Sequence, residues 1–482
     1  MVFSDLFFLF VFLPAFALLY LIGTLIDRHF PAGEERAATC RMRNAVLVVF
    51  SLIFYAWGEP VYVFLMLGSV VVNYLCGRLI DAASARRGWA LALGVAANIL
   101  ILGTFKYVGF FAQILCDVGI PVGIPNISLP IGISFYTFQS LSYLIDVYRR
   151  EAPVQRNFGG LLLYISMFPQ LIAGPIVRYD TVAREISERR VTASDLADGV
   201  FRFSLGLGKK VILANQLGEI ATQFLTNGLA DLTTSGAWIG AIAYMLQIYF
   251  DFSGYSDMAI GLGRGLGFHF NENFRHPYCC NSITDFWRRW HISLGSFFRD
   301  YVYIPMGGNR SHQALNILVV WFLTGMWHGA SWNFIIWGVY FGFIVTIEKY
   351  TLLRVHRYIP SPLLHLYSLV LVVIGWGIFY FDDSSRMMRF FQICFGQGSS
   401  FHDFVTISAL MDNCWLWVVC LLFCMPIRHW TGTLWQRIAH QGGFIHESLL
   451  FASRLTISAF LLILSVALLV GATNNAFIYT RF

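Results

Sequence analysis

The chain has 482 residues, of which 57% are hydrophobic and 12% are charged, and its mean hydropathy is +0.63. Because ordinary soluble domains carry about 25% charged residues, this composition excludes a water-soluble globular enzyme and predicts an integral membrane protein. The formal net charge is +6, but no basic run is dense enough to predict a nucleic-acid partner. The basic loops are instead expected to face membrane lipid.

Apolar stretches close to the roughly 20 residues that span a bilayer recur along the whole chain. They lie near residues 5–26, 45–57, 61–80, 88–115, 159–177, 197–220, 236–262, 314–330, 332–349, 364–381, 410–426 and 447–470, with a possible re-entrant piece near 129–145. The sequence therefore predicts an all-α integral membrane protein with about eleven to thirteen membrane helices and re-entrant pieces. Since it shows no internal repeat or long linker, one membrane domain is expected over residues 1–482.

Nine cysteines are scattered along the chain, mostly in apolar stretches. None forms a Cys-x-x-Cys motif with a histidine at zinc-finger spacing, so neither a metal site nor a disulfide framework is predicted.

The segment from Asp251 to Arg310 is too rich in charge, aromatic residues and glycine to face lipid, so it must line a water-accessible cavity or lie at an interface. Ser282 followed by Asp285 is typical of a helix start, and Pro305 before Gly307 indicates a stop. The pattern predicts one helix from about residue 284 to about residue 300.

One face of this predicted helix carries a histidine among apolar side chains, namely Trp287, His291, Leu294 and Phe298. A neighbouring face carries Arg288, Ile292 and Arg299. Such a helix can lie in the membrane interface or plug a funnel between spans, and simple anchoring by tryptophan and arginine is the structural alternative. The central position of His291 argues against anchoring alone.

His328 lies in the apolar, aromatic stretch from Thr324 to Asn333. An ionisable side chain at membrane depth is costly and is by default a candidate functional residue. Helical spacing predicts one shared face for Trp321, Gly325, His328 and Trp332. Gly325 and Gly329 would let a neighbouring helix or a substrate approach the imidazole closely. A buried histidine bonded to a backbone carbonyl remains the alternative.

Two buried histidines suit acyl transfer, because a neutral imidazole can take the proton of a hydroxyl group as its oxygen attacks an activated acyl carbon. A thioester donor with phosphate groups needs cations. The polar segment offers such cations around the expected funnel, as arginines at positions 264, 275, 288, 289, 299 and 310.

Long motifs in this chain resemble the membrane-bound O-acyltransferase family, most closely its alginate O-acetylation branch. They are YFDFSGYSDMAIGLGRGLGF, NENFRHPY, SITDFWRRWHISLGSFFRDYVYIPMGGNR and GMWHGASWNFIIWG, with LPIGISFYTFQSLSYLIDVYR at 129–149 and FPQLIAGPIVRY at 168–179. The resemblance covers essentially the whole chain. It implies a multi-span fold around a central tunnel, with residues 251–333 as the catalytic core segment.

The resemblance also implies roles for individual residues. The histidine of the family's WHG motif corresponds to His328, and the second family position, often His or Asn, corresponds to His291; both are expected to be catalytic. Arg288, Arg289 and Arg299 are expected to hold the phosphates of coenzyme A, although interfacial anchoring predicts the same residues.

The family branch implies acetyl-CoA as the donor substrate, with no permanently bound cofactor. Its acetyl group would cross the bacterial inner membrane to a secreted polysaccharide of the alginate, cellulose or peptidoglycan type. An extracytoplasmic acyltransferase with a serine nucleophile is the expected partner. D-alanyl transfer from a carrier protein to teichoic acid is the alternative within the same fold, and a non-enzymatic transporter is the alternative outside it.

Overall fold

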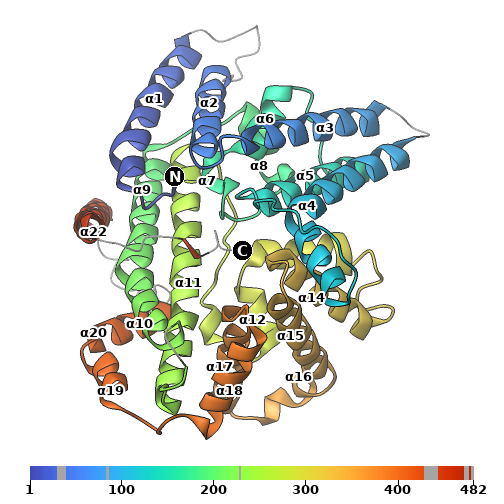
Figure 1. Ribbon diagram of the computed structural model, residues 1–482. Helices are drawn as coiled ribbons and strands as arrows, with labels where there is room; N and C mark the ends of the chain where they lie inside the picture. Colours follow the sequence, from blue (N-terminus) through green and yellow to red (C-terminus); the bar gives the residue numbers. More distant parts are fainter. Residues whose placement is uncertain (30–39, 83–85, 227–228, 428–442, 472–476, 479–482) are drawn as a thin grey trace. The chain divides into compact units, whose positions relative to one another are not determined.

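The computed structural model describes residues 1–29, 40–82, 86–226, 229–427, 443–471 and 477–478. All regular elements in these ranges are helices (Figure 1). The chain forms two compact units of contacts. Unit 1 comprises Met1–Phe203 and Tyr255–Asn271, and unit 2 comprises Ser204–Gly254 and Glu272–Phe482. The expected single domain over residues 1–482 stays a prediction.

Unit 1 is built from η1 (Phe8–Phe12), α1 (Leu13–His29), α2 (Arg41–Gly58), α3 (Tyr62–Ala82), α4 (Arg87–Asp117), α5 (Ile133–Arg149), α6 (Phe158–Ser166), α7 (Phe168–Leu171) and α8 (Tyr179–Ser187). Helix α1 packs against α2, while α3, α4 and α5 pack against one another (Figure 1). Most of α5 is buried although it carries several polar side chains. Residues of α9 (Ala193–Gly208) and α11 (Thr234–Gly265) belong to both units.

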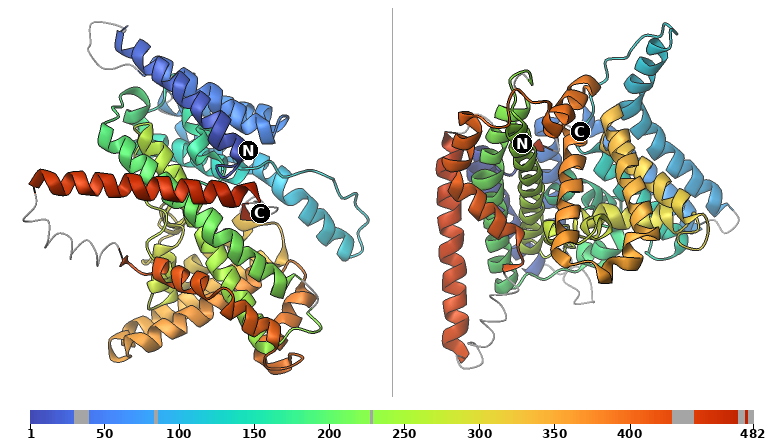
Figure 2. Two further views of the ribbon diagram at one scale, coloured as in Figure 1. Left: turned by 90° about the vertical axis from the view of Figure 1, so that its left-hand side faces the viewer. Right: turned by 90° about the horizontal axis from the view of Figure 1, so that it is seen from below.

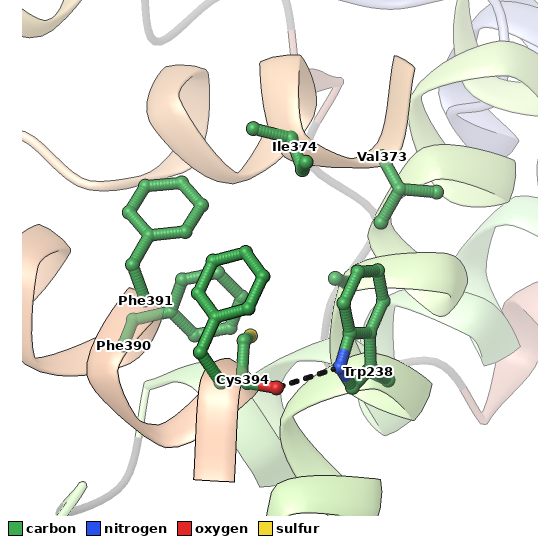
Figure 3. Close-up of a pocket in the computed structure, with 8 residues that line it drawn as sticks. Trp238, Val373, Ile374, Phe390, Phe391 and Cys394 are labelled. Atoms are coloured by element: carbon green, nitrogen blue, oxygen red, sulfur yellow. Dashed lines mark hydrogen bonds between the residues drawn. The ribbon is translucent and has the colours of Figure 1, made fainter. Parts of the chain in front are cut away.

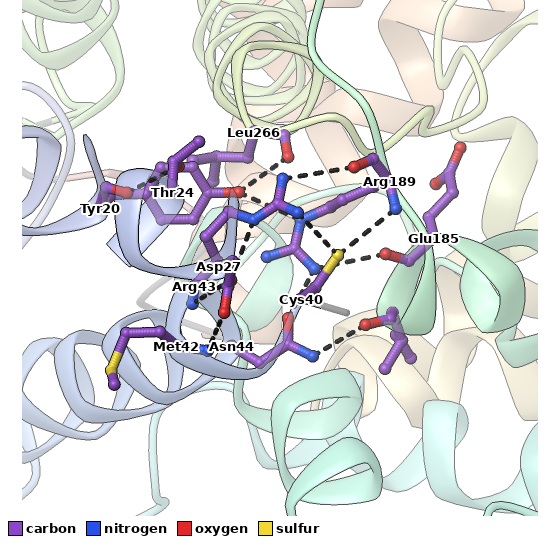
Figure 4. Close-up of polar contacts among 11 residues, drawn as sticks. Tyr20, Thr24, Asp27, Cys40, Met42, Arg43, Asn44, Glu185, Arg189 and Leu266 are labelled. Atoms are coloured by element: carbon purple, nitrogen blue, oxygen red, sulfur yellow. Dashed lines mark hydrogen bonds and ion pairs between the residues drawn. The ribbon is translucent and has the colours of Figure 1, made fainter. Parts of the chain in front are cut away.

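A buried cluster of charged side chains ties α1 to α2 in unit 1 (Figure 4). Arg43 Nε lies 3.3 Å from the carboxylate of Asp27, which also accepts the backbone N–H of Arg43 at 3.1 Å. Arg189 donates from Nε to the Tyr20 hydroxyl at 3.1 Å and from Nη1 to the Asn44 side-chain oxygen at 2.5 Å. Since buried charges are tolerated when they are paired and hydrogen-bonded, this cluster fits a role in holding the helices together.

Unit 2 holds η2 (Lys209–Ala214), α10 (Asn215–Leu225), η3 (Pro277–Cys279), α12 (Ile283–Arg289), α13 (Ile292–Phe298), η4 (Arg299–Tyr303), α14 (Gln313–His328), α15 (Trp332–Tyr350), α16 (Leu352–Val355), η5 (His356–Tyr358), α17 (Ser361–Tyr380), α18 (Ser384–Gln392), η6 (Ile393–Gln397), α19 (Phe404–Met411), α20 (Cys414–Cys424) and α22 (Gly443–Val470). The long helix α22 packs against η2 (Figure 2). Helix α15 packs against α12, α14 and α17.

Glycines allow α14 and α15 to approach closely. A Cβ atom on Gly325 would lie 2.3 Å from the carbonyl oxygen of Phe334, and one on Gly338 would lie 2.4 Å from that of Trp321. Any larger residue at either position would push the helices apart. The sequence predicts that either a neighbouring helix or a substrate comes close at Gly325. The close contact with a neighbouring helix is confirmed.

Among the described residues, six helices are long and apolar enough to cross a membrane, or seven spans if the bent pair α19 and α20 counts as one. The chain is thus a multi-pass, all-helical membrane protein, while the predicted number of about eleven to thirteen segments is not confirmed. Two predicted stretches are interrupted. Met167 separates α6 from the short α7, whose first turn holds Pro169, and α19 meets α20 at an angle of 60°.

Candidate functional site

His328 is the last residue of α14. Gly329 follows in an extended conformation, and α15 begins at Trp332. The predicted shared face of Trp321, Gly325, His328 and Trp332 is therefore wrong for Trp332, which belongs to the next helix and is 52% exposed. The last turn of a helix favours a positive charge, which suits a histidine that takes up a proton during a reaction.

Aromatic rings surround the His328 imidazole, which is only 5% exposed. The ring centroids of Trp327, Trp337 and Phe379 lie 4.9, 5.0 and 5.2 Å from it, each in an edge-to-face arrangement. The backbone carbonyl of Phe379 accepts a hydrogen bond from the Asn333 side chain at 3.1 Å, which ties α17 to the start of α15. The His328 imidazole is thus closely surrounded by aromatic rings.

Helix α12 begins as the sequence predicts. The side-chain oxygen of Ser282 accepts a hydrogen bond from the backbone N–H of Asp285 at 2.9 Å. The carboxylate of Glu348, fully buried on α15, accepts two further N–H groups, those of Ile283 and Thr284, at 2.7 Å each. A carboxylate at a helix N-terminus is stabilising, so Glu348 fixes α12 against α15.

The single helix predicted from about residue 284 to about residue 300 is wrong, because the chain breaks at His291. This residue has φ 43° and ψ 55°, a left-handed conformation that is uncommon outside glycine. The side-chain oxygen of Asn273 accepts the N–H of Ser293, and the Asn273 carbonyl accepts the N–H of Ile292. These bonds replace those of a continuous helix. Strained backbone of this kind is often found at functional sites.

The same asparagine determines which nitrogen of His291 carries the proton. Because the Asn273 side-chain oxygen accepts the backbone N–H of Ser293, it must also accept from His291 Nδ1, 3.1 Å away. The proton is therefore on Nδ1, and Nε2 is the basic nitrogen. Burial lowers the pKa of His291 to about 3, so the imidazole is neutral at physiological pH.

The two histidines are linked through one tryptophan. The ring of Trp327 lies 5.8 Å from that of His291 and 4.9 Å from that of His328. Phe252, from α11, also contacts His291, with its ring edge-to-face at 4.7 Å. The structure thus brings His291 and His328 into one aromatic cluster.

An ion pair lies next to Phe252 in the chain. The carboxylate of Asp251 is 2.6 Å from Lys210 Nζ, and both side chains are almost fully buried. Its second oxygen accepts the backbone N–H of Ile478 at 2.8 Å. Asp251 therefore holds the segment that carries Phe252 against a residue near the C-terminus.

The three arginines expected to bind coenzyme A differ in their surroundings. Arg289 pairs with Asp285 at 2.9 Å, and Arg299 pairs with Asp300 at 2.6 Å. Arg288 is exposed and forms no ion pair with any described residue. A phosphate would therefore have to compete with a carboxylate at Arg289 and Arg299, whereas Arg288 offers its charge directly.

Two of the pockets among the described residues lie elsewhere. In unit 2, a small apolar pocket of about 10 Å³, room for about one water molecule, is lined by Trp238 and Cys394, and the Trp238 indole donates a hydrogen bond of 3.0 Å to the Cys394 carbonyl (Figure 3). In unit 1, a pocket of about 500 Å³ lies at the ends of α3 and α5. Its charged lining residues are Asp81, Arg87, Arg150 and Glu151. Neither pocket is lined by a histidine.

Sequence reasoning alone missed the residues that position the histidines. Asn273 precedes His291 by eighteen residues and acts through its side-chain oxygen, while Trp337 and Phe379 come from other helices than His328. Asn273 and Trp337 lie within the quoted motifs NENFRHPY and GMWHGASWNFIIWG, but the motifs do not reveal which residues touch.

Comparison with known proteins agrees with these features. The membrane-bound O-acyltransferase family matches residues 151–391. The probable alginate O-acetylase AlgI of Pseudomonas aeruginosa is 42% identical over 410 residues, 83% of this chain and 76% of the relative. The peptidoglycan O-acetyltransferase of Helicobacter pylori is 35% identical over 69% of this chain and 70% of its own length.

A more distant relative, the teichoic acid D-alanyltransferase of Bacillus subtilis, is 27% identical over 56% of this chain and 69% of its own length. The names of all three relatives describe enzymes that transfer an acyl group. The chain belongs to the membrane-bound O-acyltransferase family and is an O-acyltransferase.

Proposed function

We propose that this protein takes an acetyl group from acetyl-CoA at the cytoplasmic face of a bacterial inner membrane and passes it across for O-acetylation of a secreted polysaccharide. Alginate-, cellulose- and peptidoglycan-type polymers are the acceptor class. The observation that carries the proposal is His328, buried among aromatic rings at a helix end, in a chain similar over most of its length to alginate O-acetylases.

In the proposed reaction, His328 is the general base. Its imidazole takes the proton of an acceptor hydroxyl group as the hydroxyl oxygen bonds to the acetyl carbon, and that proton then goes to the departing thiolate sulfur of coenzyme A. The aromatic walls keep water away, which protects the thioester from hydrolysis. His291, neutral and held by Asn273 through Nδ1, is the second histidine of the proposed site.

Acetyl transfer across a membrane requires a path for a small group, and a central tunnel of the kind implied by the family would provide it. The charged coenzyme stays on the cytoplasmic side, where Arg288, with lesser contributions from Arg289 and Arg299, attracts its phosphates. The acceptor hydroxyl in this step is the serine nucleophile of an extracytoplasmic acyltransferase, which becomes acetylated and then delivers the acetyl group to the polysaccharide.

Two alternatives make different demands. D-alanyl transfer to teichoic acid needs a carrier protein as donor, and its support is the weaker similarity to the Bacillus subtilis enzyme. A transporter would need no buried general base.

The test is a comparison of donors. The purified protein in nanodiscs is given acetyl-CoA or a D-alanyl carrier protein, with candidate acceptors present, and thiol release is measured. The proposal predicts release from acetyl-CoA that depends on His328. Release from the carrier protein alone would favour the D-alanyl alternative, and release from neither donor would contradict both enzyme assignments.

A further inference from the structure

Trp337 is fully buried on α15, with its ring 5.0 Å from that of His328. Its indole nitrogen is buried and has no hydrogen-bond acceptor among the described residues. A buried indole N–H usually has an acceptor, because a donor left without one costs stability. A donor kept in this state next to the candidate base calls for a chemical explanation.

Neighbouring rings hold the indole in place. The centroids of Phe341, Phe379 and Trp321 lie 5.3, 5.3 and 5.9 Å from that of Trp337. The next residue, Gly338, lies in close backbone contact with α14. Trp337 is therefore fixed before any substrate arrives, which is the condition under which a donor stabilises a transition state most effectively.

Acyl transfer supplies an acceptor for this donor. When the acceptor hydroxyl oxygen bonds to the acyl carbon, the electron pair of the C=O bond moves onto the carbonyl oxygen, which becomes negatively charged. The pair returns when the bond to the thiolate sulfur breaks. An N–H donor within reach of that oxygen favours the charged state over the starting carbonyl and so raises kcat.

We propose that Trp337 is a further catalytic residue, whose indole N–H donates to the acyl carbonyl oxygen while His328 takes the hydroxyl proton. This inference rests on the proposed acyl transfer and adds to it a residue that stabilises the negative charge. The remaining atoms of the indole form one wall of the site and limit the space beside the acyl group.

Trp287 provides a matched control. Its indole nitrogen is also buried without an acceptor among the described residues, and its ring lies in the same cluster, 5.4 Å from that of Trp337. In the chain of ring contacts it is one ring further from His328. If unpaired indole N–H groups were merely tolerated here by donating to ring faces, the two tryptophans would behave alike.

The experiment measures thiol release from acetyl-CoA, with the same candidate acceptors present, by the native protein, Trp337→Phe, Trp287→Phe and His328→Ala, each in nanodiscs at matched folded quantity. Phenylalanine keeps an aromatic ring and removes the donor. We expect Trp337→Phe to lower kcat about 10²- to 10³-fold with little change in KM, as for loss of one oxyanion donor, and Trp287→Phe to stay within about threefold of native.

Benzothienylalanine at position 337, which keeps the bicyclic shape and replaces N–H by sulfur, repeats the test if Trp337→Phe unfolds. A native kcat in either variant that lacks the N–H at position 337 would overturn the inference, and so would an equal loss of kcat at positions 287 and 337. In both cases, thiol release that depends on His328 would still support the proposed function. If the native protein releases no thiol, the proposed function fails and this inference fails with it.

Discussion

The surroundings of His328 in unit 2 and the Asp27 cluster in unit 1 show two different ways of burying ionisable groups. His328 lies among aromatic rings. Asp27 lies within hydrogen-bond distance of the backbone and side chain of Arg43. A neutral imidazole can be buried among apolar rings and still accept a proton. A buried carboxylate is charged, so it needs a cation and hydrogen-bond donors beside it. The surroundings of His328 are therefore suited to chemistry, and the Asp27 cluster is suited to stabilising the fold.

The largest expected effect is on catalysis at the first region. His328→Ala removes the proposed base and should lower the rate of thiol release from acetyl-CoA by about 10²- to 10⁴-fold, while thermal unfolding in detergent changes little. The assay compares equal amounts of folded protein. Activity close to native in this variant would remove His328 from the mechanism.

Changes in the Asp27 cluster should lower the free energy of unfolding. Asp27→Asn leaves Arg43 buried without its carboxylate and should destabilise the protein by about 3–5 kcal/mol, because breaking a buried pair strands a charge. Chemical denaturation in detergent measures this. Asp300→Asn is the control, since its partner Arg299 is 63% exposed and such pairs contribute only about 0–1 kcal/mol. Equal effects of the two variants would contradict the role assigned to the Asp27 cluster.

His291→Leu removes the hydrogen bond to Asn273 and the basic nitrogen, and should lower kcat about 10²-fold, equivalent to a buried hydrogen bond of about 1–3 kcal/mol. His291→Asn keeps a polar side chain and should retain more activity than His291→Leu. Steady-state kinetics of both variants test this order. The reverse order would indicate that only the packing of position 291 matters.

Burial of a neutral His291 also predicts a pH dependence of stability. Its folded pKa of about 3 is below the ordinary value of 6.5, so the unfolded chain binds the proton more readily. This contribution is fully present above pH 6.5 and is lost as the pH falls toward 3. At pH 5 it should amount to about 2 kcal/mol of lost stability, absent in His291→Asn. Parallel pH profiles for the two proteins would show that His291 is not buried neutral.

The smallest effect is expected at the exposed arginines. Arg288→Ala should raise KM for acetyl-CoA a few-fold and leave kcat unchanged, because an exposed charge contributes about 1 kcal/mol or less. High salt should reduce the difference from the native protein. An unchanged KM at low salt would remove Arg288 from the phosphate site.

The sequence predicts the fold class because the apolar stretches and low charge leave few alternatives to membrane helices. It also singles out His328, since one histidine between glycines and tryptophans stands out in an apolar stretch. The sequence does not predict the backbone at His291. Its side chains have helical spacing there, but the helix predicted from about residue 284 to about residue 300 is broken at this residue. That break depends on Asn273, which belongs to a separate segment, and such a tertiary contact leaves no local pattern. The predicted number of spans is not confirmed, because bends such as the one between α19 and α20 depend on packing.

The central claim is that an acetyl group crosses the membrane without its coenzyme. Inside-out vesicles from the native organism, which retain the partner protein and acceptor, are given acetyl-CoA labelled in both the acetyl group and the coenzyme. The account predicts acetyl label on luminal material and coenzyme label only outside, with neither label inside in vesicles carrying His328→Ala. Entry of both labels together would show transport of the intact thioester and would contradict the account.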